Sequence, residues 1–171
     1  MKNIIYLMLV LVVFTSCQQQ QKIGFVNNSE VINKYQMKID IENKFDNKDQ
    51  NYKKKTDSIG LAYQLDAQQT QERLSKLTEQ KQREGSQAFT QKWQVVQQQL
   101  QMEQQQMQQQ FNKEIDSVLK KVKEFVGDYG KANGYTFILG KNEAGSVMYG
   151  EEAQDLTQTI IDALNADYKK D

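Results

Sequence analysis

Few side chains in this sequence could carry out a chemical reaction. The 171 residues contain one cysteine, Cys17, and no histidine. Catalysis by a Cys–His or Ser–His pair, a zinc site of cysteine and histidine, and a disulfide within one chain are therefore excluded. The sequence predicts neither an enzyme nor a protein that binds a cofactor or a metal.

Two further patterns resemble functional motifs but do not predict a functional site. Gly130-Lys131 and Gly140-Lys141 lack the upstream glycine and the following serine or threonine of a phosphate-binding P-loop. Glu151 and Glu152 fall in a predicted turn, where neighbouring carboxylates are ordinary surface charge. Because 22 basic residues balance 22 acidic ones, no net field favours nucleic acid as a partner.

The single cysteine follows a segment with the features of a secretion signal. Lys2 precedes an unbroken apolar run from Ile4 to Phe14, which is shorter than the roughly 20 residues of a membrane-spanning helix. Residues 1–16 are therefore predicted to be a signal peptide. Thr15-Ser16-Cys17 resembles the end of the lipobox of bacterial lipoproteins, which implies cleavage before Cys17 and acylation of that residue. The alternative is an ordinary signal peptide that leaves a free cysteine.

Acylation predicts the cellular location. Two or three acyl chains hold a protein on a membrane almost permanently, whereas one chain does not. Residues 17–21 then form a polar tether, and the lack of Asp at Gln18 is similar to lipoproteins sent to an outer membrane. We expect a periplasmic protein, anchored to the inner face of the outer membrane through N-terminal acyl chains.

The middle of the chain predicts a helical hairpin. Residues 37–131 are mostly Gln, Lys, Glu, Leu, Met and Ala, which favour helices. Helices in globular proteins are far shorter than this segment, so Gly85-Ser86 predicts a reversal, and the tip of the arm, near residues 83–87. Gly60 is interpreted as a hinge in the first limb.

Heptad spacing predicts that the two limbs pack as a coiled coil. Phe45, Tyr52 and Ile59 recur every seven residues, and alternating steps of four and three join Phe111, Ile115, Val118, Val122, Phe125 and Tyr129. Nearer the tip the predicted seam thins to Leu65, Leu74 and Leu77 in the first limb and to Phe89, Trp93, Val96, Leu100 and Met107 in the second.

The two ends of the chain predict a small β-rich body made of residues 22–36 and 132–171. Residues 22–26 read as a strand, with N-cap candidates at Asn27 to Glu30. Residues 135–139 and 146–149 predict a β-hairpin, and a capping box at Asp155 opens a short helix. So few strands bury too little area to be stable alone, which predicts self-association. The expected fold class is α+β, mainly α, with a long antiparallel helical hairpin on a small β-sheet or barrel.

The ends of the chain resemble the OmpH/Skp family of periplasmic chaperones. The resemblance lies in residues 22–27 and 30–32, in Gly134 to Leu139, in Val147-Met148-Tyr149 and in Asp155 to Asn165. It implies a homotrimer with a small central barrel and three helical arms around a cavity that holds unfolded outer-membrane proteins without ATP. Well-known soluble members are strongly basic, whereas this chain is neutral, so electrostatic capture of clients is not implied.

This layout leads to predictions for individual residues. The trimer interface is expected at apolar residues of the body: Ile23, Phe25, Val26, Tyr135, Phe137, Ile138, Leu139, Val147, Tyr149, Ile160, Ile161 and Leu164. Client contacts are expected at distal residues of the arm, for which packing inside the coiled coil is the alternative: Tyr63, Leu74, Leu77, Phe89, Trp93, Leu100, Met102 and Met107.

A second function fits the same anchor and helices. A structural coiled-coil lipoprotein would act as a spacer or tether between the outer membrane and a partner. Such a spacer has no need of the strand-forming residues between Tyr135 and Tyr149, so their presence favours the chaperone.

Overall fold

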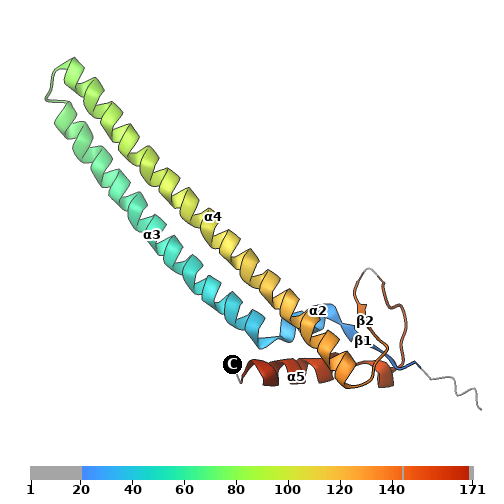
Figure 1. Ribbon diagram of the computed structural model, residues 1–171. Coiled ribbons are helices and arrows are strands. Elements are labelled where there is room, and N and C mark those ends of the chain that lie inside the picture. Colours follow the sequence, from blue (N-terminus) through green and yellow to red (C-terminus); the bar gives the residue numbers. More distant parts are fainter. Residues whose placement is uncertain (1–20, 144, 170–171) are drawn as a thin grey trace, which may run out of the picture.

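The long arm of the molecule rises from a small body formed by both ends of the chain (Figure 1). The computed structural model describes residues 21–143 and 145–169, so Cys17 and the predicted signal peptide lie outside the described residues. The elements are β1 (Ile23–Asn27), α2 (Asn28–Lys34), α3 (Gln36–Leu74), α4 (Glu79–Ala132), β2 (Phe137–Lys141), the 3-10 helix η1 (Glu152–Gln154) and α5 (Thr157–Tyr168). This arrangement confirms the predicted fold class. Among the described residues, no helix is long and apolar enough to cross a membrane.

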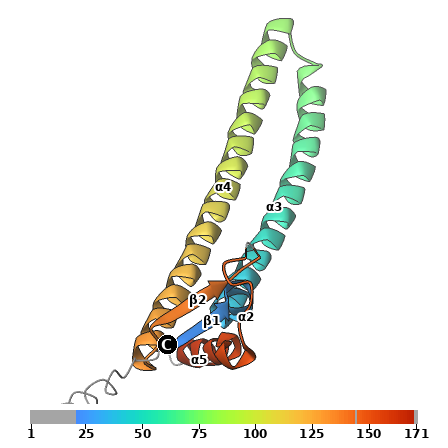
Figure 2. The same ribbon diagram turned by 90° about the vertical axis from the view of Figure 1, so that its right-hand side faces the viewer.

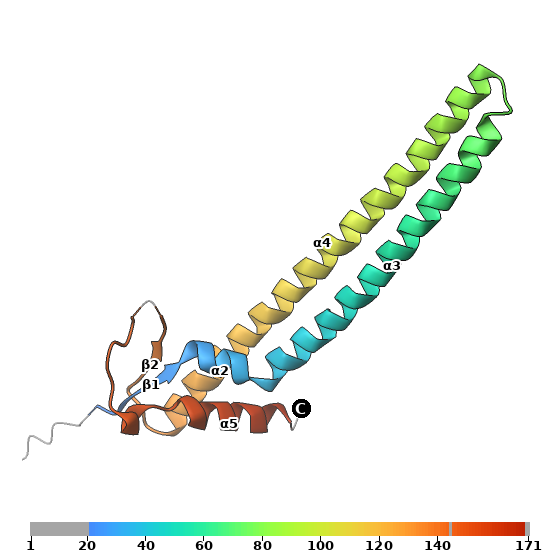
Figure 3. The ribbon, with the colours of Figure 1, turned by 180° about the vertical axis from the view of Figure 1, so that it is seen from behind.

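Helices α3 and α4 lie side by side and form the arm (Figure 3). Phe45 and Val118 are buried near its base, and the rings of Phe45 and Phe111 meet edge to face at 5.2 Å. Further out, the Tyr52 hydroxyl donates a hydrogen bond of 3.0 Å to the backbone carbonyl of Leu100. The predicted heptad seam is therefore confirmed at the base of the arm.

The tip of the arm is not where glycine predicted it. Helix α3 ends at Leu74 and α4 begins at Glu79, so the chain reverses at residues 75–78 rather than at 83–87. Gly85 lies inside α4, where a Cβ atom would overlap the Leu74 side chain. Because Leu74 is buried there, the glycine provides space for packing across the hairpin and does not form the turn.

The start of the helical region contains a break that the sequence did not predict. Asn27 caps α2 as expected, since its Oδ1 accepts the Glu30 backbone N–H over 3.1 Å. Tyr35, however, has an extended backbone with φ −72° and ψ 121° and separates α2 from α3. Its side chain is buried. This burial stabilises a kink at a position where the sequence has neither glycine nor proline.

The two strands of the body pair in parallel and come from opposite ends of the chain (Figure 2). Ile23 lies opposite Phe137, and the register runs on to Asn27 opposite Lys141. The predicted β-hairpin is therefore wrong, because residues 146–149 form no strand and β2 takes β1 as its partner.

The turn after α4 explains this pairing. Gly134 has φ +68°, a conformation that glycine adopts without steric cost. The Tyr135 backbone N–H donates back to the Gly130 carbonyl over 2.9 Å, which is the pattern of a Schellman cap. The chain is thereby directed back along α4, and Thr136 N–H bonds the Lys22 carbonyl over 2.8 Å at the start of the paired strands.

Helix α5 closes the body beneath β1 and α2 (Figures 1 and 2). The Leu156 backbone N–H donates to the Phe25 carbonyl over 2.8 Å, which attaches the start of α5 to β1. Asp155 Oδ1 accepts the Thr157 backbone N–H over 2.8 Å, but the N-cap position of α5 is Leu156, which makes no side-chain cap bond. The predicted capping box is incomplete, because the Gln158 side chain bonds Asp162 within the helix instead.

Candidate assembly and client-binding surfaces

One face of the two-stranded sheet carries exposed apolar side chains. Side chains of paired residues in a sheet point to the same side, and successive residues alternate. Ile23, Phe137 and Leu139 lie on the side away from the core, and Phe137 is 54% exposed. We call these three residues the outer sheet face. Within the described residues, β2 pairs with β1 alone, so its second edge is open.

Five of the residues predicted at the trimer interface are instead buried inside the chain. Phe25, Val26, Ile160, Ile161 and Leu164 are each less than 7% exposed. Phe25 shares the side of the outer sheet face but is covered near Gly150, and the other four belong to the core around α5. They stabilise the body that presents the outer sheet face and do not form an exposed surface themselves.

The remaining predicted interface residues lie at the edges of the body. The Tyr135 ring stacks on Tyr129 at 6.3 Å and carries the Lys22 ammonium 4.1 Å from its centroid. Ile138 packs on the inner side against α4, at the backbone of Gly130.

The segment after β2 contains the most exposed apolar residues of the body. Val147 is half-buried, whereas Tyr149 is 84% exposed. The neighbouring Met148 is 87% exposed and was not among the predicted site residues. Met148 lay in a predicted strand, and this position could have added it to the predicted interface residues.

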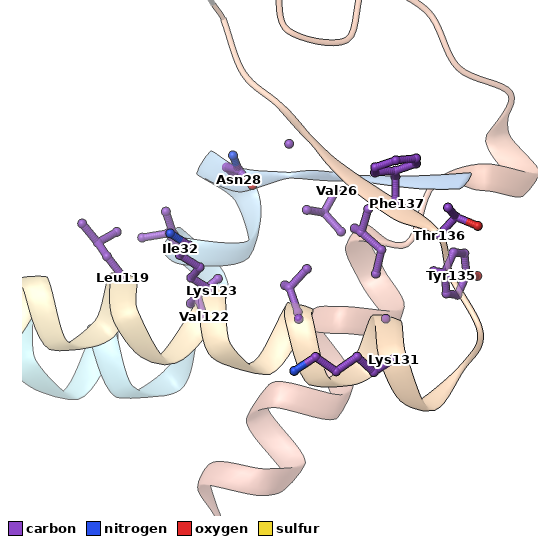
Figure 4. A pocket seen from close by; sticks show the side chains of 15 residues that line it. Val26, Asn28, Ile32, Leu119, Val122, Lys123, Lys131, Tyr135, Thr136 and Phe137 are labelled. Atoms are coloured by element: carbon purple, nitrogen blue, oxygen red, sulfur yellow. The ribbon is translucent and has the colours of Figure 1, made fainter. Parts of the chain in front are cut away.

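A groove separates the inner side of the sheet from α4 (Figure 4). Its volume is about 580 Å³, and Val26, Ile32, Val122, Val126 and Ile138 are among the apolar residues that line it. Lys123 and Lys131 of α4 and Thr136 near the start of β2 add polar groups. Ile138 and Gly140 of β2 both line it, so the groove follows the inner side of β2.

Three aromatic side chains form a cluster in the distal half of the arm. Tyr63 meets Trp93 edge to face at 5.0 Å and Phe89 at 5.5 Å. Asp66 joins this cluster, because its Oδ2 accepts the Trp93 indole N–H over 2.9 Å and the Lys92 ammonium over 2.8 Å. Hydrogen bonding by Lys92 and then by Trp93 lowers the pKa of the Asp66 carboxyl below its ordinary value of 3.8.

The other predicted client-binding residues divide by exposure. Leu74 is buried against Gly85, so it packs the tip and is not available to a client. Leu100 and Met107 are half-buried in the seam between the helices. Leu77 in the tip turn and Met102 on α4 are exposed, as is part of the Tyr63 ring.

Apolar side chains outside the predicted seam add to the exposed surface of the arm. Leu61 on α3 and Val95 on α4 are 68% and 62% exposed, and neither was predicted. Leu65 was predicted in the seam but is exposed, because Asp66 faces α4 in its place. Leucine or valine outside a heptad seam was the sequence signal for these positions.

The architecture is that of a helical arm mounted on a small α+β body, and comparison with known proteins identifies its family. A family model for OmpH-like outer membrane proteins matches residues 22–164. The chain therefore belongs to the OmpH-like outer membrane protein family, which confirms the resemblance seen in the sequence.

Solved structures contain the same fold. An OmpH-like protein of Caulobacter crescentus CB15, proposed to be an outer membrane chaperone, superposes with a TM-score of 0.74 at 13% sequence identity. The match covers 86% of this chain and 85% of that chain. At this identity the similarity concerns the fold. Comparison with curated proteins gave no match.

Proposed function

We propose that this protein is an ATP-independent holdase chaperone of the periplasm, which binds unfolded outer-membrane proteins between the arms of a homotrimer. The observation that carries this proposal is the arm, whose helices of 39 and 54 residues expose apolar side chains at Leu61, Val95 and Met102. Membership of the OmpH-like family and the similarity to the Caulobacter protein support it.

The physical basis is the sequestration of an aggregation-prone client. A membrane β-barrel in transit exposes apolar side chains and unpaired strand edges, which lead to aggregation. Many contacts of about 1 kcal/mol each would retain the client through avidity and still release it intact. Such binding requires no chemical step and no cofactor.

Assembly into a homotrimer would cover the exposed parts of the body. The outer sheet face and the open edge of β2 are both free to meet another copy. Residues 146–149 have the composition of a strand and expose Met148 and Tyr149, so they are suited to pair with a neighbouring copy. Closing strand edges in this way also removes a route to aggregation.

Acylation of Cys17 and a position at the inner face of the outer membrane belong to the same proposal. An anchored arm would meet clients close to the membrane into which they insert. The intact mass of the membrane-extracted protein should show an acylated Cys17 at its N-terminus, and Cys17→Ser should move the protein to the soluble fraction. Unmodified Cys17 in the membrane fraction would contradict acylation.

The decisive experiment is an aggregation assay with purified residues 18–171. A urea-unfolded outer-membrane β-barrel is diluted into buffer without ATP, and light scattering is recorded with increasing amounts of the protein. We expect scattering to be suppressed near one trimer per client, whereas an unrelated coiled-coil protein at equal mass should have no effect. Aggregation that continues at trimer excess would favour the spacer function.

A further inference from the structure

The break between α2 and α3 leaves backbone groups that the helices cannot satisfy. At a helix end, the last carbonyls and the first N–H groups have no partner within the helix. The extended backbone of Tyr35 places such an end and such a start next to each other, at Lys34 and Gln36.

One side chain from the opposite end of the chain bonds to both of these residues. The Gln36 backbone N–H donates to Oδ1 of Asn165 over 2.7 Å. Nδ2 of Asn165 donates to the Lys34 carbonyl over 3.0 Å. A carboxamide has both a donor and an acceptor, so this single residue of α5 bridges the end of α2 and the start of α3.

Further contacts hold α5 along α2. The Tyr35 ring packs edge to face on Tyr168 at 5.8 Å, and the Tyr168 hydroxyl donates to Asp40 of α3 over 3.1 Å. At the other end of α2, the Asn27 backbone N–H donates to the Thr157 hydroxyl over 2.9 Å. Helix α5 is thus attached at both ends of α2, and Figure 1 shows it extending below the base of α3.

The arm is connected to the body through both of its helices. Helix α4 runs without a break from the tip into the body, and α3 is tied to α4 at the tip by residues 75–78. When two helices that lie side by side bend together, they slide along each other unless they are fixed to each other at both ends. The bridge at Asn165 fixes the base of α3, so it opposes sliding and therefore bending of the arm.

We propose that Asn165 is a positioning residue that sets the direction and limits the bending of the arm relative to the body. Without the bridge, the Tyr168–Asp40 bond still holds the base of α3 to α5, but α3 can slide further at the Tyr35 break and the arm bends more. This inference goes beyond the holdase proposal and is independent of it, because arm direction is a property of the protein without a client.

The test measures the arm in the presence and absence of the bridge. Spin labels are placed at exposed Glu72 on α3 and exposed Gln154 in η1, in purified protein with Cys17→Ser. Dilution with unlabelled protein restricts the measured distances to one chain. Asn165→Ala removes the bridge, and Gln158→Ala is the matched control on α5, because the Gln158 side chain bonds Asp162 within the same helix.

We expect Asn165→Ala to widen the Glu72–Gln154 distance distribution about twofold, as a released hinge does, and Gln158→Ala to leave it unchanged. Amide hydrogen exchange at Gln36 should become faster in Asn165→Ala alone. Asn165→Asp keeps the acceptor for Gln36 and loses the donor to Lys34, so it should give an intermediate width, and it provides the test if the alanine variant fails to fold. An unchanged distribution together with faster Gln36 exchange would overturn the proposal.

Discussion

Trp93 of α4 donates its indole N–H to Asp66 of α3 over 2.9 Å, and this bond links the two helices in the distal half of the arm. Lys92 donates to the same carboxylate oxygen over 2.8 Å. Leu65 next to Asp66 faces solvent, so Asp66 lies between the helices beside the rings of Tyr63, Phe89 and Trp93. A charged group therefore contributes to the contact between α3 and α4 next to an aromatic cluster.

The pairing of Asp66 predicts a pH dependence. Its pKa is lowered in the folded protein, so the stabilisation is present above the unfolded value of 3.8 and is lost as the pH falls below it. Trp93 is the single tryptophan, so its emission should change below pH 3.8. In Asp66→Asn the emission should depend little on pH in this range. Far-UV circular dichroism at each pH separates the local change from unfolding, and equal titrations in both proteins would contradict the prediction.

Two helical glycines should respond differently to alanine. A Cβ atom at Gly60 meets no atom within 4 Å, and α3 continues through this position. Gly60→Ala should therefore increase the free energy of unfolding by about 1 kcal/mol through helix propensity. Gly85→Ala should lose this gain, because the buried Leu74 must move. Urea unfolding followed at 222 nm compares the two, and equal stabilisation would show that Leu74 repacks without cost.

The N-cap of α2 should contribute measurably to stability. Asn27→Ala removes the acceptor for the Glu30 backbone N–H and should lower the free energy of unfolding by about 1 kcal/mol. Ser29→Ala, a change at an exposed residue in the first turn of α2, is the control and should stay within about 0.5 kcal/mol of the parent. Thermal unfolding measures both variants. If both variants lowered the free energy of unfolding equally, the assignment of Asn27 as the N-cap would be contradicted.

The proposed trimer should depend on the outer sheet face. Phe137→Glu places a charge where the ring would be buried between copies, so the dissociation constant of the assembly should rise at least about tenfold, which corresponds to 1.4 kcal/mol. Leu61→Glu makes the same kind of change on the arm and should leave the mass unaltered. Size-exclusion chromatography with light scattering over a dilution series distinguishes them. A trimer that persists in Phe137→Glu would exclude this face as the contact.

Client binding should weaken modestly when one exposed contact is removed. Met102→Gln keeps helix propensity nearly constant and removes an exposed apolar side chain. A loss of about 1 kcal/mol corresponds to roughly fivefold weaker binding of an unfolded barrel. Gln101→Ala on the same helix should bind normally. Fluorescence anisotropy of a labelled client provides the affinities, and an unaffected Met102→Gln variant would remove this residue from the contact surface.

Local patterns predicted the elements better than their partners. Heptad spacing identified the buried Val118 and Val122, and the Asn27 cap was visible as a short-range motif. The tip was misplaced because Gly85 serves the packing of Leu74, a contact that the linear sequence does not reveal.

The errors at the surfaces have the same origin. The strand predicted at residues 135–139 was expected to pair with residues 146–149, yet β2 forms at residues 137–141 and pairs with β1, which is distant in sequence. Asn165 was not singled out, because its two bonds reach residues at the other end of the chain. Spacing within an element can be read from the chain, whereas pairing between distant elements depends on the whole fold.

The parallel pairing of β1 and β2 also favours one order of folding. During synthesis β1 emerges first and has no partner strand until both helices of the arm and β2 have left the ribosome. Collapse of the intervening helices brings their two bases together and replaces a long flexible loop with a short one, which reduces the entropy lost on strand pairing by about 2 kcal/mol. We therefore expect the arm to form before β1 and β2 pair and the body is completed.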